Sequence, residues 1–142
     1  MSRPLYESAG DLANEKRVGE ILAPFGYRLQ KLPMQYGLDV VIWDHSENKP
    51  AAFGEIKART FEMTKFETAM VNLHKVVRAK QLTDVTGLPS YLLVLWTDAL
   101  GRISFDDEHS LQMGGRYDRG DPQDSDICAY YPIDRFKVLS RF

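Results

Sequence analysis

Three charged side chains near the middle of the chain have the types and spacing needed to activate water against a phosphate ester. Asp39 leads directly into an apolar run, and Glu55 and Lys57 lie two residues apart in the next apolar segment. Two carboxylates on adjacent strands can hold a divalent cation such as Mg²⁺, which keeps waters and substrate phosphate oxygens as its other ligands. A lysine beside them can orient or help to deprotonate an attacking water and offset charge that develops on the phosphate.

These side chains must be positioned by two neighbouring strands. Residues 38–43 are apolar and rich in β-branched side chains, which is typical of a strand buried on both faces, and residues 44–50 have the composition of a turn. Residues 51–58 then form the partner strand, in which Glu55 and Lys57 point to the same face. The sequence thus predicts a hairpin in the middle of a sheet, with charge at the end of each strand.

Hydropathy and turn residues predict the other elements, although with less specific patterns. The apolar residues that favour the longer predicted helix recur at helical spacing and are Phe66, Ala69, Met70, Leu73, Val76, Val77 and Leu82. In chain order the expected elements are a helix at 8–24, a strand at 27–32, a helix at 64–86, a central strand at 91–97, a strand at 101–105, a loop at 106–126, a strand at 127–131 and a short helix around 133–139. This order predicts one α/β domain spanning residues 1–142, with a mixed central β-sheet flanked by helices.

Composition excludes several classes of protein. The 142 residues are 44% hydrophobic and 27% charged, as in ordinary globular domains and unlike disordered or fibrous chains. No segment approaches membrane-spanning length and the N-terminus lacks the apolar run of a signal peptide, so we expect no membrane association. Cys128 is the one cysteine, which precludes an intramolecular disulfide and favours a reducing, cytoplasmic setting.

The net charge of -2 gives no overall attraction to nucleic acid, but the basic residues are unevenly distributed. Six of them lie between positions 57 and 80, against only two acids, Glu62 and Glu67. Lys75 and Arg78 of this segment are candidate nucleic-acid contacts. Arg116 and Arg119, in a loop rich in glycine, are further candidates that could reach a phosphate backbone.

The segments GLDVVIWD and GEIKA resemble the PD-(D/E)xK nuclease superfamily. Asp39 occupies its aspartate position and Glu55-Ile56-Lys57 its E-x-K, while Leu38 stands where the family often has proline. The resemblance implies a restriction-endonuclease-like core of αβββαβ order, with Asp39 and Glu55 as metal ligands and Lys57 as a catalytic residue.

The same resemblance implies supporting residues on the two helices. Its first helix often carries a metal-supporting glutamate, and Glu15 shares a face with Leu12, Val18 and Leu22, whereas Glu20 points to the opposite side. We therefore expect Glu15 to be a third metal ligand. The helix after the hairpin often supplies a polar or basic residue, for which Gln81 matches the family pattern better than Arg78.

The leading hypothesis is a nuclease that hydrolyses DNA phosphodiester bonds with Mg²⁺, or with Mn²⁺ as a substitute. An alternative is a non-catalytic nucleic-acid-binding or assembly protein on the same fold, and another is a structural charge cluster in an unrelated enzyme. The small stand-alone members that the chain resembles include junction resolvases and phage nucleases. A chain of this size needs help to grip both strands of a duplex, so we expect a homodimer.

Overall fold

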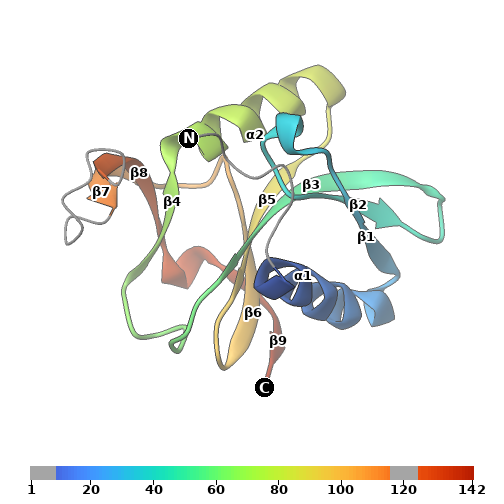
Figure 1. Ribbon diagram of the computed structural model, residues 1–142, viewed down its shortest axis with the longest axis horizontal. Helices are drawn as coiled ribbons and strands as arrows, with labels where there is room; N and C mark the ends of the chain where they lie inside the picture. Colours follow the sequence, from blue (N-terminus) through green and yellow to red (C-terminus); the bar gives the residue numbers. More distant parts are fainter. Residues whose placement is uncertain (1–8, 116–124) are drawn as a thin grey trace.

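The computed structural model describes residues 9–115 and 125–142, which form two α-helices and two β-sheets around two hydrophobic interiors (Figure 1). In chain order the elements are α1 (Ala9–Leu22), η1 (Ala23–Phe25), β1 (Tyr27–Lys31), η2 (Met34–Tyr36), β2 (Val40–Asp44), β3 (Lys49–Ala58), β4 (Thr68–Asn72), α2 (Leu73–Thr86), β5 (Ser90–Leu95), β6 (Ala99–Ser104), β7 (Ser110–Gly115), β8 (Ser125–Pro132), η4 (Ile133–Arg135) and β9 (Lys137–Arg141). Neither α-helix is long and apolar enough to cross a membrane.

The larger sheet is mixed, as the sequence predicts. Among the described residues its strand order is β1-β2-β3-β5-β6-β9, in which β3 and β5 are parallel and the other neighbours antiparallel. The parallel pair requires a crossover, which α2 provides. The predicted hairpin is present as β2 and β3, and the strand expected to be central is β5, between β3 and β6.

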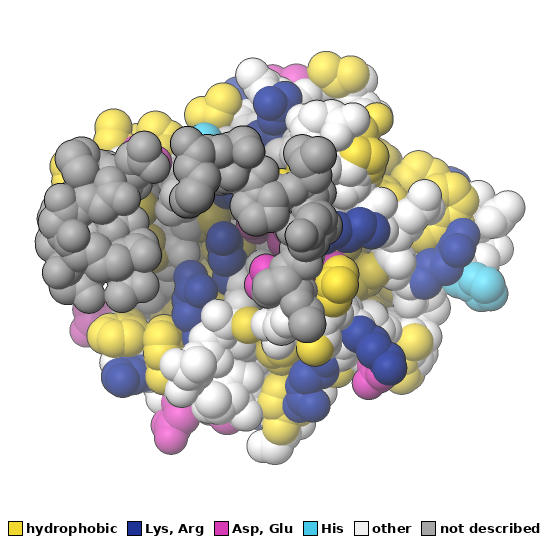
Figure 2. All heavy atoms as spheres, in the orientation of Figure 1, with side chains coloured by type: hydrophobic (Ala, Val, Ile, Leu, Met, Phe, Trp, Pro, Cys, Tyr) yellow, Lys and Arg dark blue, Asp and Glu magenta, His cyan; other side chains and the backbone are white. Residues whose placement is uncertain are grey.

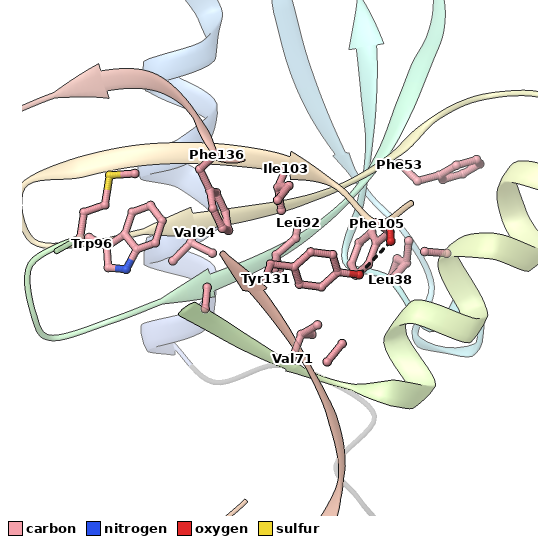
Figure 3. Close-up of a cluster of buried hydrophobic side chains, with 14 of the residues drawn as sticks. Leu38, Phe53, Val71, Leu92, Val94, Trp96, Ile103, Phe105, Tyr131 and Phe136 are labelled. Carbon is pink, nitrogen blue, oxygen red and sulfur yellow. Dashed lines mark hydrogen bonds between the residues drawn. The ribbon is translucent and has the colours of Figure 1, made fainter. Parts of the chain in front are cut away.

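The two faces of this sheet are covered by different elements. Val18 and Leu22 of α1 pack on one face against residues such as Val40 and Leu93. The smaller sheet, of order β4-β8-β7, covers the other face together with α2. Figure 3 shows the second interior, where Tyr131 lies among apolar side chains and its hydroxyl donates to the Phe105 carbonyl at 2.8 Å.

The predicted helix at 64–86 is wrong over its first part. Residues Thr68–Asn72 form strand β4, and α2 begins only at Leu73. Ala69 and Val71 are buried while their neighbours are more exposed, which is the period of two expected of a strand. The apolar residues at 66, 69, 70 and 73 fit helical spacing equally well, and pairing with β8 decides between the two conformations.

Two predictions near the C-terminus are also wrong. The short helix expected at 133–139 is a single 3-10 turn, Ile133–Arg135, followed by strand β9, which pairs with β6 at the edge of the large sheet. The loop expected at 106–126 contains strand β7, which pairs with β8. Both are edge strands, whose conformation depends on a distant partner more than on their own hydropathy pattern.

Candidate active site

The candidate site lies where β3 extends beyond its partner β2. The pairing of β2 with β3 ends at Val40 opposite Gly54, so in the described structure residues 55–58 pair only with β5. Asp39 precedes β2 and occupies the start of this open edge. Its backbone N–H donates to the Gly54 carbonyl at 3.1 Å, and its Oδ2 accepts a 2.8 Å hydrogen bond from the Ile56 N–H. The Asp39 carboxylate is therefore fixed beside β3.

A polar hollow of about 460 Å³ opens at this edge. It is lined from α1 by Asp11, Asn14 and Glu15, from the hairpin by Asp39, Glu55, Lys57 and Arg59, and from the β4–α2 junction by Asn72, His74 and Lys75. Figure 2 shows acidic and basic side chains close together near the middle of the face that it views. Five of the predicted site residues thus line one hollow, namely Glu15, Asp39, Glu55, Lys57 and Lys75.

Glu55 is the buried acid of this hollow. The residue is only 2% exposed, and two ammonium groups lie near its carboxylate: Lys57 Nζ is 3.5 Å from Oε2 and Lys75 Nζ is 3.3 Å from Oε1. Oε1 nevertheless has no partner with hydrogen-bond geometry. Burial, followed by repulsion from Asp39, raises the pKa of Glu55 despite both lysines. The two lysines therefore do not fully offset the cost of burying this carboxylate beside Asp39.

Glu15 faces the same hollow from α1 and forms an ion pair with Lys31 of β1, with a distance of 2.8 Å from Nζ to Oε1. Burial raises the pKa of Glu15 to about 7, with further contributions from Asp39, Asp11 and Glu55. The Lys31 ammonium acts in the opposite direction, but a single pairing does not offset burial and three acidic neighbours. The hollow therefore favours a bound positive charge.

The residues expected on the second helix are divided between two places. Lys75, predicted as a nucleic-acid contact, reaches Glu55 and also donates a 2.8 Å hydrogen bond to the Gly37 carbonyl. Gln81, predicted as catalytic, is exposed and lines a different hollow with Arg78 and Val77, so the structure does not bring it to the carboxylates. Lys75 lies in the first turn of α2 and Gln81 more than one turn further along, and only the first turn faces the site.

Arg78, another predicted nucleic-acid contact, does not adjoin the carboxylates. Arg78 is exposed on α2, with its side chain against Gly37. Arg116 and Arg119 fall outside the described residues, so their prediction has no structural counterpart here.

Two basic residues near the carboxylates escaped the sequence reasoning. Arg59 continues the alternation of Glu55 and Lys57 along β3, a signal that the sequence contained, and its guanidinium donates to the carbonyls of Ala58 and Met70. Burial lowers its pKa. Lys31 gave no such signal, because its place beside Glu15 depends on the pairing of β1 with β2.

The donor set fits one kind of metal site better than another. In the described part of the chain no three or more His, Cys, Asp or Glu side chains are grouped so as to hold a metal ion. Mg²⁺, however, is commonly bound through one or two carboxylates, with water and phosphate oxygens completing its shell. Asp39 and Glu55 supply two carboxylates. The buried Oε1 of Glu55 has no hydrogen-bond partner, and a bound cation would compensate for this. The hollow therefore fits a hard divalent cation and not a site built entirely from protein ligands.

Comparison with known proteins identifies the class of protein to which this fold and site belong. The family model described as "Phage putative PDDEXK endonuclease" matches residues 1–139. The chain belongs to this family, and it is a nuclease of the PD-(D/E)xK type. No curated protein matches the sequence significantly.

A solved structure has the same fold. Hjc, a Holliday junction resolvase from the archaeal hyperthermophile Archaeoglobus fulgidus, is similar with a TM-score of 0.59 over 87% of this chain and 84% of that chain. The sequences are 10% identical, so this similarity concerns the fold alone. The predicted restriction-endonuclease-like architecture is confirmed.

Proposed function

We propose that this nuclease hydrolyses DNA phosphodiester bonds with Mg²⁺, or Mn²⁺ as a substitute, in the hollow at the open edge of β3. The observation that carries the proposal is the buried Glu55 carboxylate beside Asp39, with one oxygen lacking a hydrogen bond and two lysines nearby. Burying a charge in this way is costly unless the group has a function or a ligand that compensates for it.

Asp39 and Glu55 would hold the cation. Glu15, expected as a third ligand, is not grouped with them closely enough for that in the described structure, and it would instead add negative charge to the hollow from α1. A bound divalent cation supplies polarisation of the phosphate and a lower pKa for a coordinated water. Asp39 is already fixed in position by the Ile56 N–H, so little side-chain entropy remains to be lost on binding. Ionisation of Glu15 near neutral pH would increase the negative charge available to the cation.

Lys57 would orient the attacking water and offset negative charge on the phosphate during in-line attack. Its ammonium is 3.5 Å from Glu55, and its side chain is one-third exposed, so it can also reach the open side of the hollow. Lys75 has a positioning role, because it connects Glu55 to the Gly37 carbonyl. Gln81 and Arg78 would act further away, as contacts from the exposed face of α2 to the DNA backbone.

A non-catalytic DNA-binding or assembly protein on this fold is the second candidate. The two lysines within 3.5 Å of Glu55 favour it, since ion pairs to both carboxylate oxygens can offset the buried charge without a metal. Under either function, a homodimer would let this small chain contact both strands of a duplex. Sedimentation of the purified protein with and without DNA tests this association.

The test is cleavage of linear, nicked, branched and single-stranded DNA with Mg²⁺ or Mn²⁺. Branched DNA belongs in the panel because Hjc is named as a Holliday junction resolvase. We expect Asp39→Ala and Lys57→Ala each to lower the cleavage rate by roughly 10²- to 10⁴-fold, the range typical of lost acid–base or electrostatic groups.

Glu20→Ala is the matched control, because Glu20 is an exposed acid of α1 outside this hollow. It should leave cleavage unchanged. DNA binding by the native protein without cleavage in either metal would reject the catalytic proposal in favour of the binding scaffold.

A further inference from the structure

A second chemically distinctive surface follows directly after the site strand. The segment from 60 to 67, here called the aromatic loop, connects β3 to β4. Phe61 and Phe66 form an edge-to-face pair with ring centroids 5.0 Å apart, and Lys65 Nζ lies 5.5 Å and 5.6 Å from the two rings. Phe61 packs against the core, whereas Phe66 is 53% exposed.

The aromatic loop is held in place from both sides. The buried Met63 donates its N–H to Asp98 Oδ1 at 2.9 Å, and the Phe61 carbonyl accepts a 3.1 Å hydrogen bond from the Thr97 N–H. At the far end of the loop, the Glu67 carbonyl accepts a 2.9 Å hydrogen bond from Ile133. The exposed Phe66 ring is therefore presented by an anchored loop, so little conformational entropy is lost when a ligand packs on it.

The side chains around the aromatic loop are suited to contact the phosphate backbone of a DNA strand. A hollow of about 470 Å³ beside the Phe61 ring is lined by the hydroxyl-bearing Thr60, Thr64 and Thr97, together with Lys65. Lys65 also lies near the Phe66 ring and so connects this hollow with it. Threonine hydroxyls and lysine ammonium groups are common contacts to phosphate and sugar oxygens. Glu62 also lines this hollow and opposes an anion there, so we place the phosphate on the threonine and lysine side.

The aromatic loop is within reach of a DNA strand bound in the active-site hollow. Arg59 lines that hollow and immediately precedes the loop, and Figure 1 shows β3 running to the loop and β4 returning from it. Lys57, which would orient the attacking water, is four residues before Phe61, and this chain spans at most about 13 Å at about 3.3 Å per residue. The Phe66 ring lies 5.0 Å from that of Phe61, so the two sites are within about 20 Å, or roughly six base pairs of duplex.

We propose that Phe66 stacks on an unpaired base while Lys65 and the neighbouring threonines contact the adjoining phosphate. The preferred substrate would then carry an unpaired base, in a tail, flap or open end, within about six base pairs of the cleaved bond. This inference rests on the proposed function for its ligand, DNA. An exposed aromatic face with a cation beside it matches the base and phosphate of a single strand, whereas a continuous duplex hides its base faces.

The experiment measures binding by the full chain in chelator, so that cleavage cannot interfere. The probes are a duplex with a single-stranded tail that carries 2-aminopurine, and a relaxed, covalently closed circular duplex as competitor. Phe66→Ala should weaken binding of the tailed duplex by roughly 5- to 100-fold, as for loss of one stacked base, and should reduce quenching of 2-aminopurine. Binding of the closed circle should stay unchanged.

Three further variants show whether the contact is stacking. Phe66→Trp should retain tailed-duplex binding, whereas Phe66→Leu, which is apolar but not aromatic, should lose it. Phe25→Ala is the matched control, because Phe25 is 61% exposed on a different part of the surface. Binding by Phe66→Leu equal to the native protein, or equal weakening of both DNAs by Phe66→Ala, would overturn the proposal.

The outcomes also separate this inference from the proposed nuclease activity. Cleavage that needs Asp39 and Lys57, combined with binding that is indifferent to Phe66, would leave the nuclease proposal intact and reject the stacking site. Phe66-dependent binding of tailed DNA without any cleavage would support the stacking site and reject the catalytic proposal.

Discussion

The two halves of β3 have the same backbone conformation but different surroundings. In the first half, which pairs with β2, Ala52 and Phe53 are buried in the interiors on the two faces of the sheet. The second half has lost β2 as a neighbour, and beside the apolar Ile56 it buries the charged Glu55. A central strand can therefore hold a ligand site where it extends beyond its partner strand. The sheet still excludes water from one side there, while the open edge admits a ligand.

The largest expected effect is a loss of cleavage, without loss of folding, when Glu55 in the open half of β3 is substituted. Glu55→Gln keeps the shape of the side chain but removes its charge, so cleavage should fall by roughly 10²- to 10⁴-fold while circular dichroism stays native. Calorimetric titration should show weaker Mg²⁺ binding. A variant that cuts DNA at the native rate would remove Glu55 from the site.

The closed half should respond in the opposite way. Phe53 of the closed half, 7% exposed, pairs with Val41 of β2 and packs in the interior between the large sheet, the small sheet and α2. Phe53→Ala should lower the free energy of unfolding by about 3–5 kcal/mol, through lost burial and a cavity. Urea denaturation measures this loss. Cleavage per folded molecule should stay near the native value, and a specific loss of activity without loss of stability would contradict the division of β3 into two halves.

The third expected effect concerns pH. The pKa of Glu15 is raised from 4.5 to about 7 in the folded protein, so the folded state retains a proton that the unfolded state releases. The associated stability is present below pH 4.5 and is lost as pH rises through about 7. In chelator, the native protein should therefore lose more stability than Glu15→Gln between these pH values, by about 1–2 kcal/mol once solvent screening of this partly exposed carboxyl is taken into account.

Denaturation at pH 5 and pH 8 in chelator checks this difference. Mg²⁺ should restore more stability at pH 8 than at pH 5, because ligand carboxylates must be ionised to bind it. Parallel pH profiles for native protein and Glu15→Gln would show that Glu15 titrates normally.

The smallest expected effect comes from α2. Gln81→Ala removes an exposed side chain that lines a separate hollow, so single-turnover cleavage should change little. Weaker DNA binding with an unchanged cleavage rate would fit a backbone contact. A loss of rate as large as that of Glu55→Gln would show that Gln81 enters the active site when DNA is bound.

The sequence alone predicted the elements whose patterns are local. The β-branched run of β2, its turn and the apolar strands β3 and β5 are specified by residues close in the chain, and so is α1. Asp39, Glu55 and Lys57 could be found because they lie on these strands at fixed spacing. The aromatic loop, in contrast, falls in part within the helix that the sequence predicts at 64–86. The reason is that Phe66 and Ala69 fit helical spacing as well as they fit a loop followed by a strand.

Tertiary structure decided what depends on distant partners. Strand β9 exists because β6 offers an edge, and β4 exists because β8 pairs with it. Contacts at the site depend on distant partners in the same way. The pairing of β1 with β2 places Lys31 beside Glu15. Lys75, and not Gln81, reaches Glu55, because only the first turn of α2 lines the hollow. Residue types and their spacing along the chain indicate which side chains could bind a cation and activate water. The three-dimensional packing decided which of them share one hollow, because burial and proximity between distant segments have no local signature.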